Sequence, residues 1–191
     1  AMWLLFGIYG KEEVPLEAED FVYLPPGVDH GVANPFNQPV EVIVMGFHMP
    51  AGQTSATPTW PMLANAAQAR KQVVGSHPPS TLFQLLMGDT TSKRDVIAAG
   101  HLLTSLFIME FAPGGTNHPH HHPNEEEIYL VLEGHGEMVA GGGANGIEGR
   151  RSARAGDAYF FRLNCTVGFY ADSEPAARKA RILAVRSRYP R

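Results

Sequence analysis

The sequence lacks most features of an extracellular, membrane-spanning or nucleic-acid-binding protein. Cys165 is its one cysteine, which excludes an internal disulfide framework and is compatible with a reducing cytoplasm. No run of about 18 apolar residues occurs, so no segment is predicted to cross a membrane as a helix. The formal net charge of −4 gives no electrostatic reason to expect nucleic acid. We therefore expect a cytoplasmic protein with neither nucleic acid nor a membrane as partner.

The composition is that of a globular chain rich in turns. Of 191 residues, 44% are hydrophobic, 20 are glycine and 15 are proline, which allows one large domain or two small ones. Segments rich in branched and aromatic residues, most of them bounded by glycine or proline, are predicted to be strands. Many short strands indicate a sandwich or barrel. The predicted strands are 2–9, 20–24, 40–48, 101–112, 127–133, 137–140, 157–161, 166–170 and 180–187.

One segment breaks this pattern and is predicted to be a helix. Residues 58–75 are rich in alanine, and Pro61 stands near the start of the alanine-rich run, as is common in the first turn of a helix. We expect this helix to link two domains.

Histidines with strand spacing occur between Gly114 and Gly134. Side chains two apart on a strand share a face, so His120 and His122 can converge on one ion while His121 faces away. After a turn, an adjacent antiparallel strand would bring the carboxylate of Glu127 against both imidazoles. Two neutral nitrogens and one oxygen suit a divalent transition metal.

Neighbouring residues leave alternatives to this ligand set. His118 has the same parity as the pair, but Pro119 interrupts the strand between them. Glu126 would replace Glu127 if the turn were one residue tighter. A third reading is a solvated histidine-rich loop that binds nothing.

The spacing of these residues resembles the first conserved motif of the cupin superfamily, and the letters PGGTNHPHHHP are particularly similar to its germin branch. A second motif of that family is matched at 19–34, where Pro25, Gly27, His30 and Asn34 are in register and Glu19 replaces a glycine. The second motif therefore precedes the first. That order resembles a bicupin, in which the tail of one barrel is followed by a complete one.

The resemblance implies an all-β fold, the double-stranded β-helix or jelly-roll barrel. We expect a partial N-terminal barrel at 1–57, the linker helix at 58–75 and a C-terminal barrel at 76–191. A small barrel needs roughly eight strands to close, and residues 1–50 offer about half that number. We expect either residues before Ala1 or strands from elsewhere to complete it. The resemblance also implies a homodimer.

A later copy of the second motif should follow Glu127, and 156–171 lies there. Gly156 matches, but Asn164 stands at a glycine position and Val167 at that of the fourth metal ligand, a histidine. No histidine follows His135. The predicted metal set is therefore His120, His122 and Glu127 alone.

Other residues are weaker candidates. His30 is either a metal ligand of the first barrel or a structural histidine that caps a turn. Asn117 lies near substrate by resemblance, or simply holds a turn. Candidate substrate-lining residues also include Val167, Tyr129 and Tyr159, although the tyrosines could be ordinary core aromatics. Cys165 is expected to pack inertly, because no basic partner stands beside it in the sequence.

Two function classes follow from the resemblance. The first is a metal-dependent enzyme that acts on a small oxygenated molecule, with dioxygenase-like oxidation favoured over decarboxylation or isomerisation. Fe(II) or Mn(II) would be the favoured cofactor, with Zn(II) and Ni(II) as alternatives. The second class is a non-catalytic binding or storage protein with a vestigial metal site. Fold alone does not choose between them.

Overall fold

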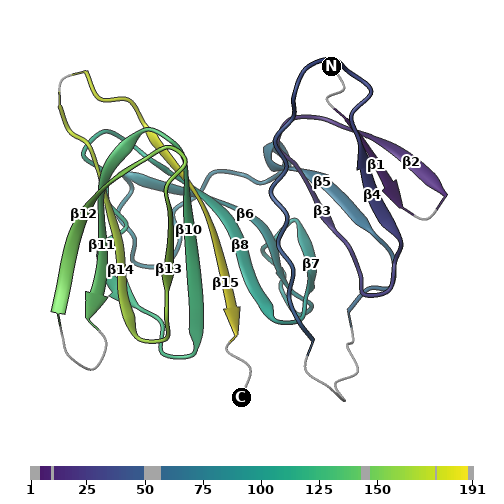
Figure 1. The fold of residues 1–191 in the computed structure, drawn as a ribbon. Helices are drawn as coiled ribbons and strands as arrows, with labels where there is room; N and C mark the ends of the chain where they lie inside the picture. The colour runs from purple at the N-terminus through teal and green to yellow at the C-terminus, as the bar shows by residue number, and fades with distance from the viewer. Residues whose placement is uncertain (1–4, 10, 50–56, 143–146, 175, 189–191) are drawn as a thin grey trace.

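A computed structural model describes residues 5–9, 11–49, 57–142, 147–174 and 176–188. It confirms an all-β fold, in which the described residues contain a single short 3₁₀ helix, η1 (Ala66–Gln68), besides the strands. Two sheets form a sandwich from the C-terminal half of the chain, and shorter strands from the N-terminal part lie beside it (Figure 1). No helix in the described part is long and apolar enough to cross a membrane.

The larger sheet of the sandwich has six strands in the order β13-β10-β15-β8-β6-β7. All neighbours are antiparallel except β6 and β7, which are parallel. The strands are β6 (Thr81–Asp89), β7 (Ile97–Gly100), β8 (Leu103–Phe111), β10 (Glu125–Glu133), β13 (Ala158–Phe161) and β15 (Ala180–Arg188).

The smaller sheet has four antiparallel strands in the order β12-β11-β14-β9. The strands are β9 (His120–His121), β11 (His135–Gly142), β12 (Ile147–Arg154) and β14 (Cys165–Ala171). The two sheets face each other, and alternate side chains of each strand fill the space between them. On β10, Tyr129 and Val131 are buried and point inward, whereas Ile128 is exposed and points outward.

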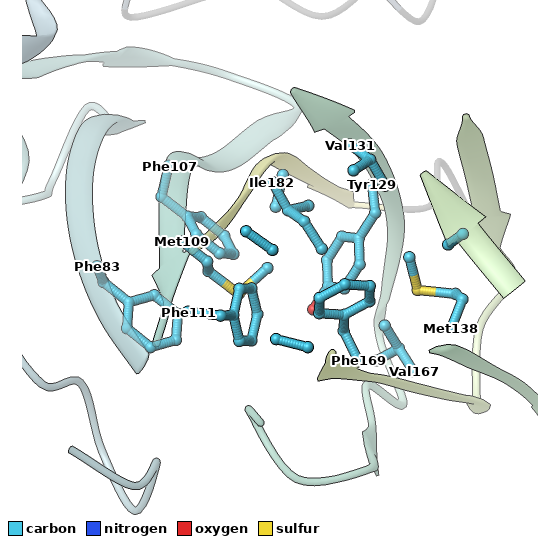
Figure 2. Close-up of a cluster of buried hydrophobic side chains, with 14 of the residues drawn as sticks. Phe83, Phe107, Met109, Phe111, Tyr129, Val131, Met138, Val167, Phe169 and Ile182 are labelled. Atoms are coloured by element: carbon cyan, nitrogen blue, oxygen red, sulfur yellow. The ribbon is translucent and has the colours of Figure 1, made fainter. Parts of the chain in front are cut away.

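The core between the sheets is aromatic and tightly closed. Figure 2 shows Phe111 of β8 and Phe169 of β14 reaching toward each other from opposite sheets. Their ring centroids are 5.0 Å apart and the angle between the ring planes is 63°, an edge-to-face arrangement that aromatic pairs prefer. Tyr129 and Phe161 make a similar contact at 5.2 Å. These aromatic side chains fill much of the space between the two sheets.

A second apolar core lies on the outer face of the six-stranded sheet. Small alanines from the segment before β6, including Ala64 and Ala66, pack against Leu86, Ile108 and Val185. Gln84 attaches this cover to the sheet, since its buried Nε2 donates to the carbonyl oxygens of two of these alanines, Ala66 at 2.9 Å and Ala69 at 3.1 Å. The inner and outer faces of this sheet are therefore both covered over much of its width.

The helix predicted at 58–75 is wrong. The segment instead forms β5 (Met62–Asn65), η1 and an isolated bridge between Gln72 and Phe83. β5 pairs with β3 (Asp20–Tyr23). Alanine's helix propensity is a weak preference, and here main-chain pairing and burial of alanines against the sheet override it. The division into 1–57, 58–75 and 76–191 otherwise stays a prediction.

The N-terminal part contains a three-stranded sheet of β1 (Leu5–Tyr9), β2 (Glu12–Leu16) and β4 (His30–Ala33). The strand predicted at 40–48 is wrong, because that segment has no regular structure and Val42, Ile43 and Val44 are exposed. A strand needs a neighbour for its main-chain groups, and no described segment pairs with this one.

The two segments that the sequence compares with the family's second motif, 19–34 and 156–171, share positive φ at two equivalent positions. Glu19 and Gly156 occupy the leading glycine position and have φ of 66° and 94°. Gly27 and Asn164 occupy the second glycine position, with φ of 78° and 62°. Positive φ is costly for most residues and tolerated best by glycine and asparagine. Where the sequence departs from glycine, the backbone therefore keeps the shape that glycine would favour.

Candidate metal site

His120 and His122 point to the same side of the chain, as their spacing predicts. Their rings lie 4.8 Å apart at 87°, and the two Nε2 atoms are 3.1 Å apart. His121 is exposed on the opposite side. β9 pairs with β14, where His120 is opposite Val167.

Glu127 approaches the histidines from the other sheet. Its Oε2 lies 3.4 Å from Nε2 of His122, and one donor atom from each of the three side chains lies within 4.8 Å of the others. The expectation that the histidine strand and the Glu127 strand are antiparallel neighbours is wrong, because β9 and β10 belong to different sheets. The turn at Pro123, which lacks an N–H for a continued ladder, carries the chain across the sandwich.

The carboxylate of Glu127 is buried without adequate pairing. Glu127 is 2% exposed, and its Oε2 has no hydrogen bond within the described part of the chain. Arg186, its direct partner on β15, places Nε 3.8 Å from Oε1, which is too long for a hydrogen bond. A buried carboxylate oxygen without a partner is costly. A cation between this oxygen and the imidazoles would supply the missing interaction.

Local backbone geometry prepares His120 to bind a cation. Its Nδ1 lies 2.8 Å from the carbonyl oxygen of His118, which can only accept, so Nδ1 carries the proton and Nε2 offers its lone pair. His118 has φ of 53°, a conformation that forms part of this turn. Burial, followed by the nearby His122 ring, lowers the pKa of His120 and favours its neutral form.

The two motif glycines have a conformational role. Gly114 and Gly134 have φ of 71° and 78°. A Cβ on Gly134 would also lie 2.7 Å from the carbonyl oxygen of Lys179. Only glycine therefore suits position 134, where the chain turns directly after the end of β10.

Asn117 and Tyr129 form one buried hydrogen-bonded unit beside the three donors. Asn117 Nδ2 donates to the Tyr129 hydroxyl at 3.0 Å, and the Phe169 amide donates to Asn117 Oδ1 at 2.9 Å. Asn117 thus ties its loop to β14. Burial, followed by the charge of Glu127, raises the pKa of Tyr129 well above its usual value. Both residues line the cavity described below.

The structure places the remaining predicted residues elsewhere. Tyr159 donates from its hydroxyl to the Ser152 carbonyl at 3.1 Å and does not line the cavity. Val167 is buried in the core and does not line it either. Cys165 packs against the same core and is not disulfide-bonded.

The alternative ligands lie outside the group of converging donor atoms. His118 is exposed, and Glu126 is on the opposite face of β10 from Glu127. His30 is exposed, and its Nδ1 lies 2.8 Å from the Val28 carbonyl oxygen, which fits its alternative role in a turn. The described part of the chain contains no metal-ligand group around His30.

A small cavity of about 40 Å³, partly open to solvent, surrounds the three donors. Its walls combine apolar side chains such as Phe83, Leu85 and Phe107 with the cationic Arg186 and with His77. Sequence reasoning missed His77 and Arg186. Neither belongs to a motif, and nothing local indicates that the loop of His77 or the last strand folds against residues 120–127.

The family described as "Cupin domain" matches residues 5–46 and 107–178, together more than half of the chain. No curated protein matches the chain in sequence.

Solved structures share the fold at low sequence identity. A predicted oxalate decarboxylase from Thermotoga maritima is 18% identical, with a TM-score of 0.52, over 67% of this chain and 100% of its own. A protein from Pseudomonas aeruginosa, provisionally named as glyoxylate-induced, is 19% identical with a TM-score of 0.67. That match covers 98% of this chain but 64% of the other, so this chain spans less than two thirds of it. On the extent of the family match, the chain belongs to the cupin family.

Proposed function

We propose that His120, His122 and Glu127 hold one divalent transition metal that binds a small oxygenated molecule. The observation that carries this proposal is the convergence of two imidazole nitrogens and an unpaired buried carboxylate oxygen within 4.8 Å. Two histidines and one carboxylate leave coordination positions open, a set that suits Fe(II) and accommodates Mn(II), Zn(II) or Ni(II). When bound, such a metal would act as a Lewis acid toward an oxygen ligand.

The protein's own groups define what enters the site. The Arg186 guanidinium faces two carboxylates. Its Nε lies 3.8 Å from Oε1 of Glu127, and its Nη1 lies 3.4 Å from Oε2 of Glu125. A bound divalent cation would give these groups a net positive charge, and a positive charge favours anionic or strongly polar oxygen ligands. Apolar walls from Phe83 and Phe107 limit water and strengthen these interactions.

We favour an enzyme that oxidises its substrate with dioxygen, since the three-ligand set leaves room for two further ligands. Decarboxylation and isomerisation are the competing reaction types. A similar solved structure is named as a predicted oxalate decarboxylase, so oxalate belongs among the compounds to test. The alternative is a non-catalytic binding or storage protein, and Val167 at the fourth ligand position is the observation that favours it.

Metal content and oxygen uptake test the proposal in sequence. Purified protein should contain about one metal per chain, and a His120→Ala/His122→Ala variant should contain almost none, whereas His121→Ala should match the wild type. Equal metal content in all three proteins would remove the proposal. Oxygen uptake with oxalate, catechols, flavonols and β-diketones then separates the two function classes, because metal binding without turnover of any compound favours the binder.

We also propose a bicupin arrangement, with an incomplete N-terminal barrel. It is supported by the two separate matches to the family and by the shared positive φ values at Glu19 and Gly156, and at Gly27 and Asn164. The germin-like segment at 113–123, in the proposed C-terminal barrel, remains a resemblance in sequence.

A homodimer is a further proposal, through the uncovered part of the six-stranded sheet's outer face. Ile128 and Phe160 are directly paired there and are 43% and 58% exposed, next to the apolar cover over the rest of that face. Phe160→Glu should convert a dimer to a monomer in size-exclusion chromatography with light scattering. Trp60→Glu, which changes a similarly exposed residue elsewhere, is the control. A wild-type monomer would contradict the proposal.

A further inference from the structure

His77 is a cavity residue that no sequence motif contains. It lies in the loop before β6, outside both segments that match the family. Its ring packs against Phe83 at a centroid distance of 4.9 Å and meets the His120 ring edge-on at 5.3 Å. A histidine from a distant part of the chain therefore forms part of the wall around the three donor atoms.

The protonation of the His77 ring follows from its hydrogen bond. Nδ1 lies 2.7 Å from the carbonyl oxygen of Asn117. A carbonyl can only accept, so Nδ1 carries the hydrogen and Nε2 of the neutral ring offers a lone pair. His120 is oriented in the same way by the next carbonyl along the chain, that of His118. Two consecutive carbonyls thus set the tautomer of two cavity histidines.

The loop that orients His77 is firmly held. The Asn117 side chain is bonded at both ends, to Tyr129 and to the Phe169 amide. Thr81 Oγ1 donates to the neighbouring carbonyl of Thr116 at 2.7 Å. Such support gives a side chain one defined position.

His77 is not one of the converging donors. Ligands on one ion at about 2.1 Å lie within roughly 4.2 Å of each other, and the close group contains only His120, His122 and Glu127. Within the described residues, Nε2 of His77 has no hydrogen-bond partner. Its lone pair is therefore available to a molecule in the cavity.

We propose that His77 Nε2 accepts a hydrogen bond from a hydroxyl group of the ligand bound at the metal's open positions. This inference rests on the proposed metal site. The ligand class is a small molecule that carries a hydroxyl next to a metal-binding oxygen, such as a 2-hydroxycarboxylate. Its carboxylate suits the positive site beside Arg186, and the hydroxyl reaches Nε2 of His77, which the described cavity wall offers in addition to the three donors.

The test compares two ligands that differ by one hydroxyl. Lactate and propionate share the carboxylate, and their binding to Mn²⁺-loaded protein can be measured by calorimetry. Wild type should bind lactate about 3–10-fold more tightly than propionate, the contribution of one hydrogen bond. His77→Asn can keep the donor to Asn117 while it removes the acceptor, so this preference should disappear. His77→Gln, with an oxygen near the position of Nε2, should retain part of it.

Controls separate this inference from the metal site itself. His121→Asn changes an exposed neighbour of the ligands and should keep the lactate preference. Mn²⁺ affinity should stay within about threefold of wild type in His77→Asn, because His77 is neither a ligand nor hydrogen-bonded to one, so the roughly 10–100-fold cost of losing an outer-shell partner does not apply. Loss of Mn²⁺ binding in that variant, an unchanged lactate preference, or no preference in wild type would each overturn the inference. Wild-type protein that binds no metal would overturn the proposed function as well.

Discussion

Val167 lies directly opposite His120 across the β9–β14 pair, so the two side chains share a face of the sheet. The family resemblance assigns a histidine to this position. The protein has an apolar group there, 1% exposed and packed in the core. Within the described residues, the converging group therefore has three donors, and Val167 adds none from β14.

Val167→His should therefore add a third imidazole, which would be the fourth donor of the site. We expect metal affinity to rise by about tenfold or more, equivalent to a further 1.4 kcal/mol or more from one donor. Titration calorimetry with Mn²⁺ or Zn²⁺ checks this. Thr166→His is the matched control, because Thr166 pairs with the outward-facing His121 and its substitute should leave affinity unchanged. Equal gains in both variants would argue against the inward position of residue 167.

Glu127→Gln should affect folding stability and metal affinity differently. Removal of a buried charge that lacks a hydrogen bond at Oε2 should leave the unfolding free energy of the metal-free protein unchanged or raise it by about 1 kcal/mol. Metal affinity should fall at least about 100-fold, because a ligand is lost. Urea unfolding and calorimetry measure the two effects. A large loss of stability in the metal-free variant would instead indicate a structural carboxylate.

Substitutions of Asn164 test whether the positive φ at this position, near the metal site, costs stability. Asn164 has φ of 62°, and its amide donates to the His122 carbonyl at 2.9 Å. Asn164→Gly should be nearly neutral, whereas Asn164→Ala should lower the unfolding free energy by about 1 kcal/mol, since alanine is strained in this conformation. Thermal unfolding of the two variants is the measurement, and equal stability would contradict the argument.

Glu110 should make stability depend on pH. Its partial burial raises the pKa, but hydrogen bonds from Lys71 at 2.8 Å and Lys179 at 3.0 Å outweigh this, and the pKa is lowered overall. The unfolded state therefore binds protons at higher pH than the folded state. The stabilisation is present above the unfolded value of 4.5 and is lost as pH falls through the lower folded value.

Glu110→Gln should consequently cost about 1 kcal/mol near pH 7, and less as the pH falls below 4.5. Urea denaturation at pH 7, 5 and 3 gives the difference between variant and wild type. Glu137→Gln is the control, because its pair with Arg150 is exposed on both sides and should contribute little. A difference that stays constant with pH would contradict the proposed ion pairs.

Much of the candidate site was predictable because it depends on local geometry. The parity of His120, His121 and His122 follows from side-chain alternation along an extended chain, and the structure confirms it. The same alternation puts Glu127 inside and Ile128 outside. His77 and Arg186 were not predictable, since they reach the cavity by contacts between segments far apart in the sequence.

The incorrect predictions share a physical cause. The alanine-rich segment 58–75 has helix propensity, but its alanines are small enough to lie flat on the sheet, and Gln84 binds their carbonyls. Segment 40–48 has strand composition but no described partner. Propensity describes one segment by itself, whereas pairing and burial depend on what lies beside it.

The amino-acid sequence by itself determined the all-β class and the face on which each histidine lies. These properties are set by backbone sterics over a few residues. Only the tertiary structure decided that Glu127 meets the histidines from the opposite sheet, that Arg186 stands beside it, and that His77 enters the cavity. Those contacts depend on how distant strands pack together, and long-range packing is not encoded in the spacing of neighbouring residues.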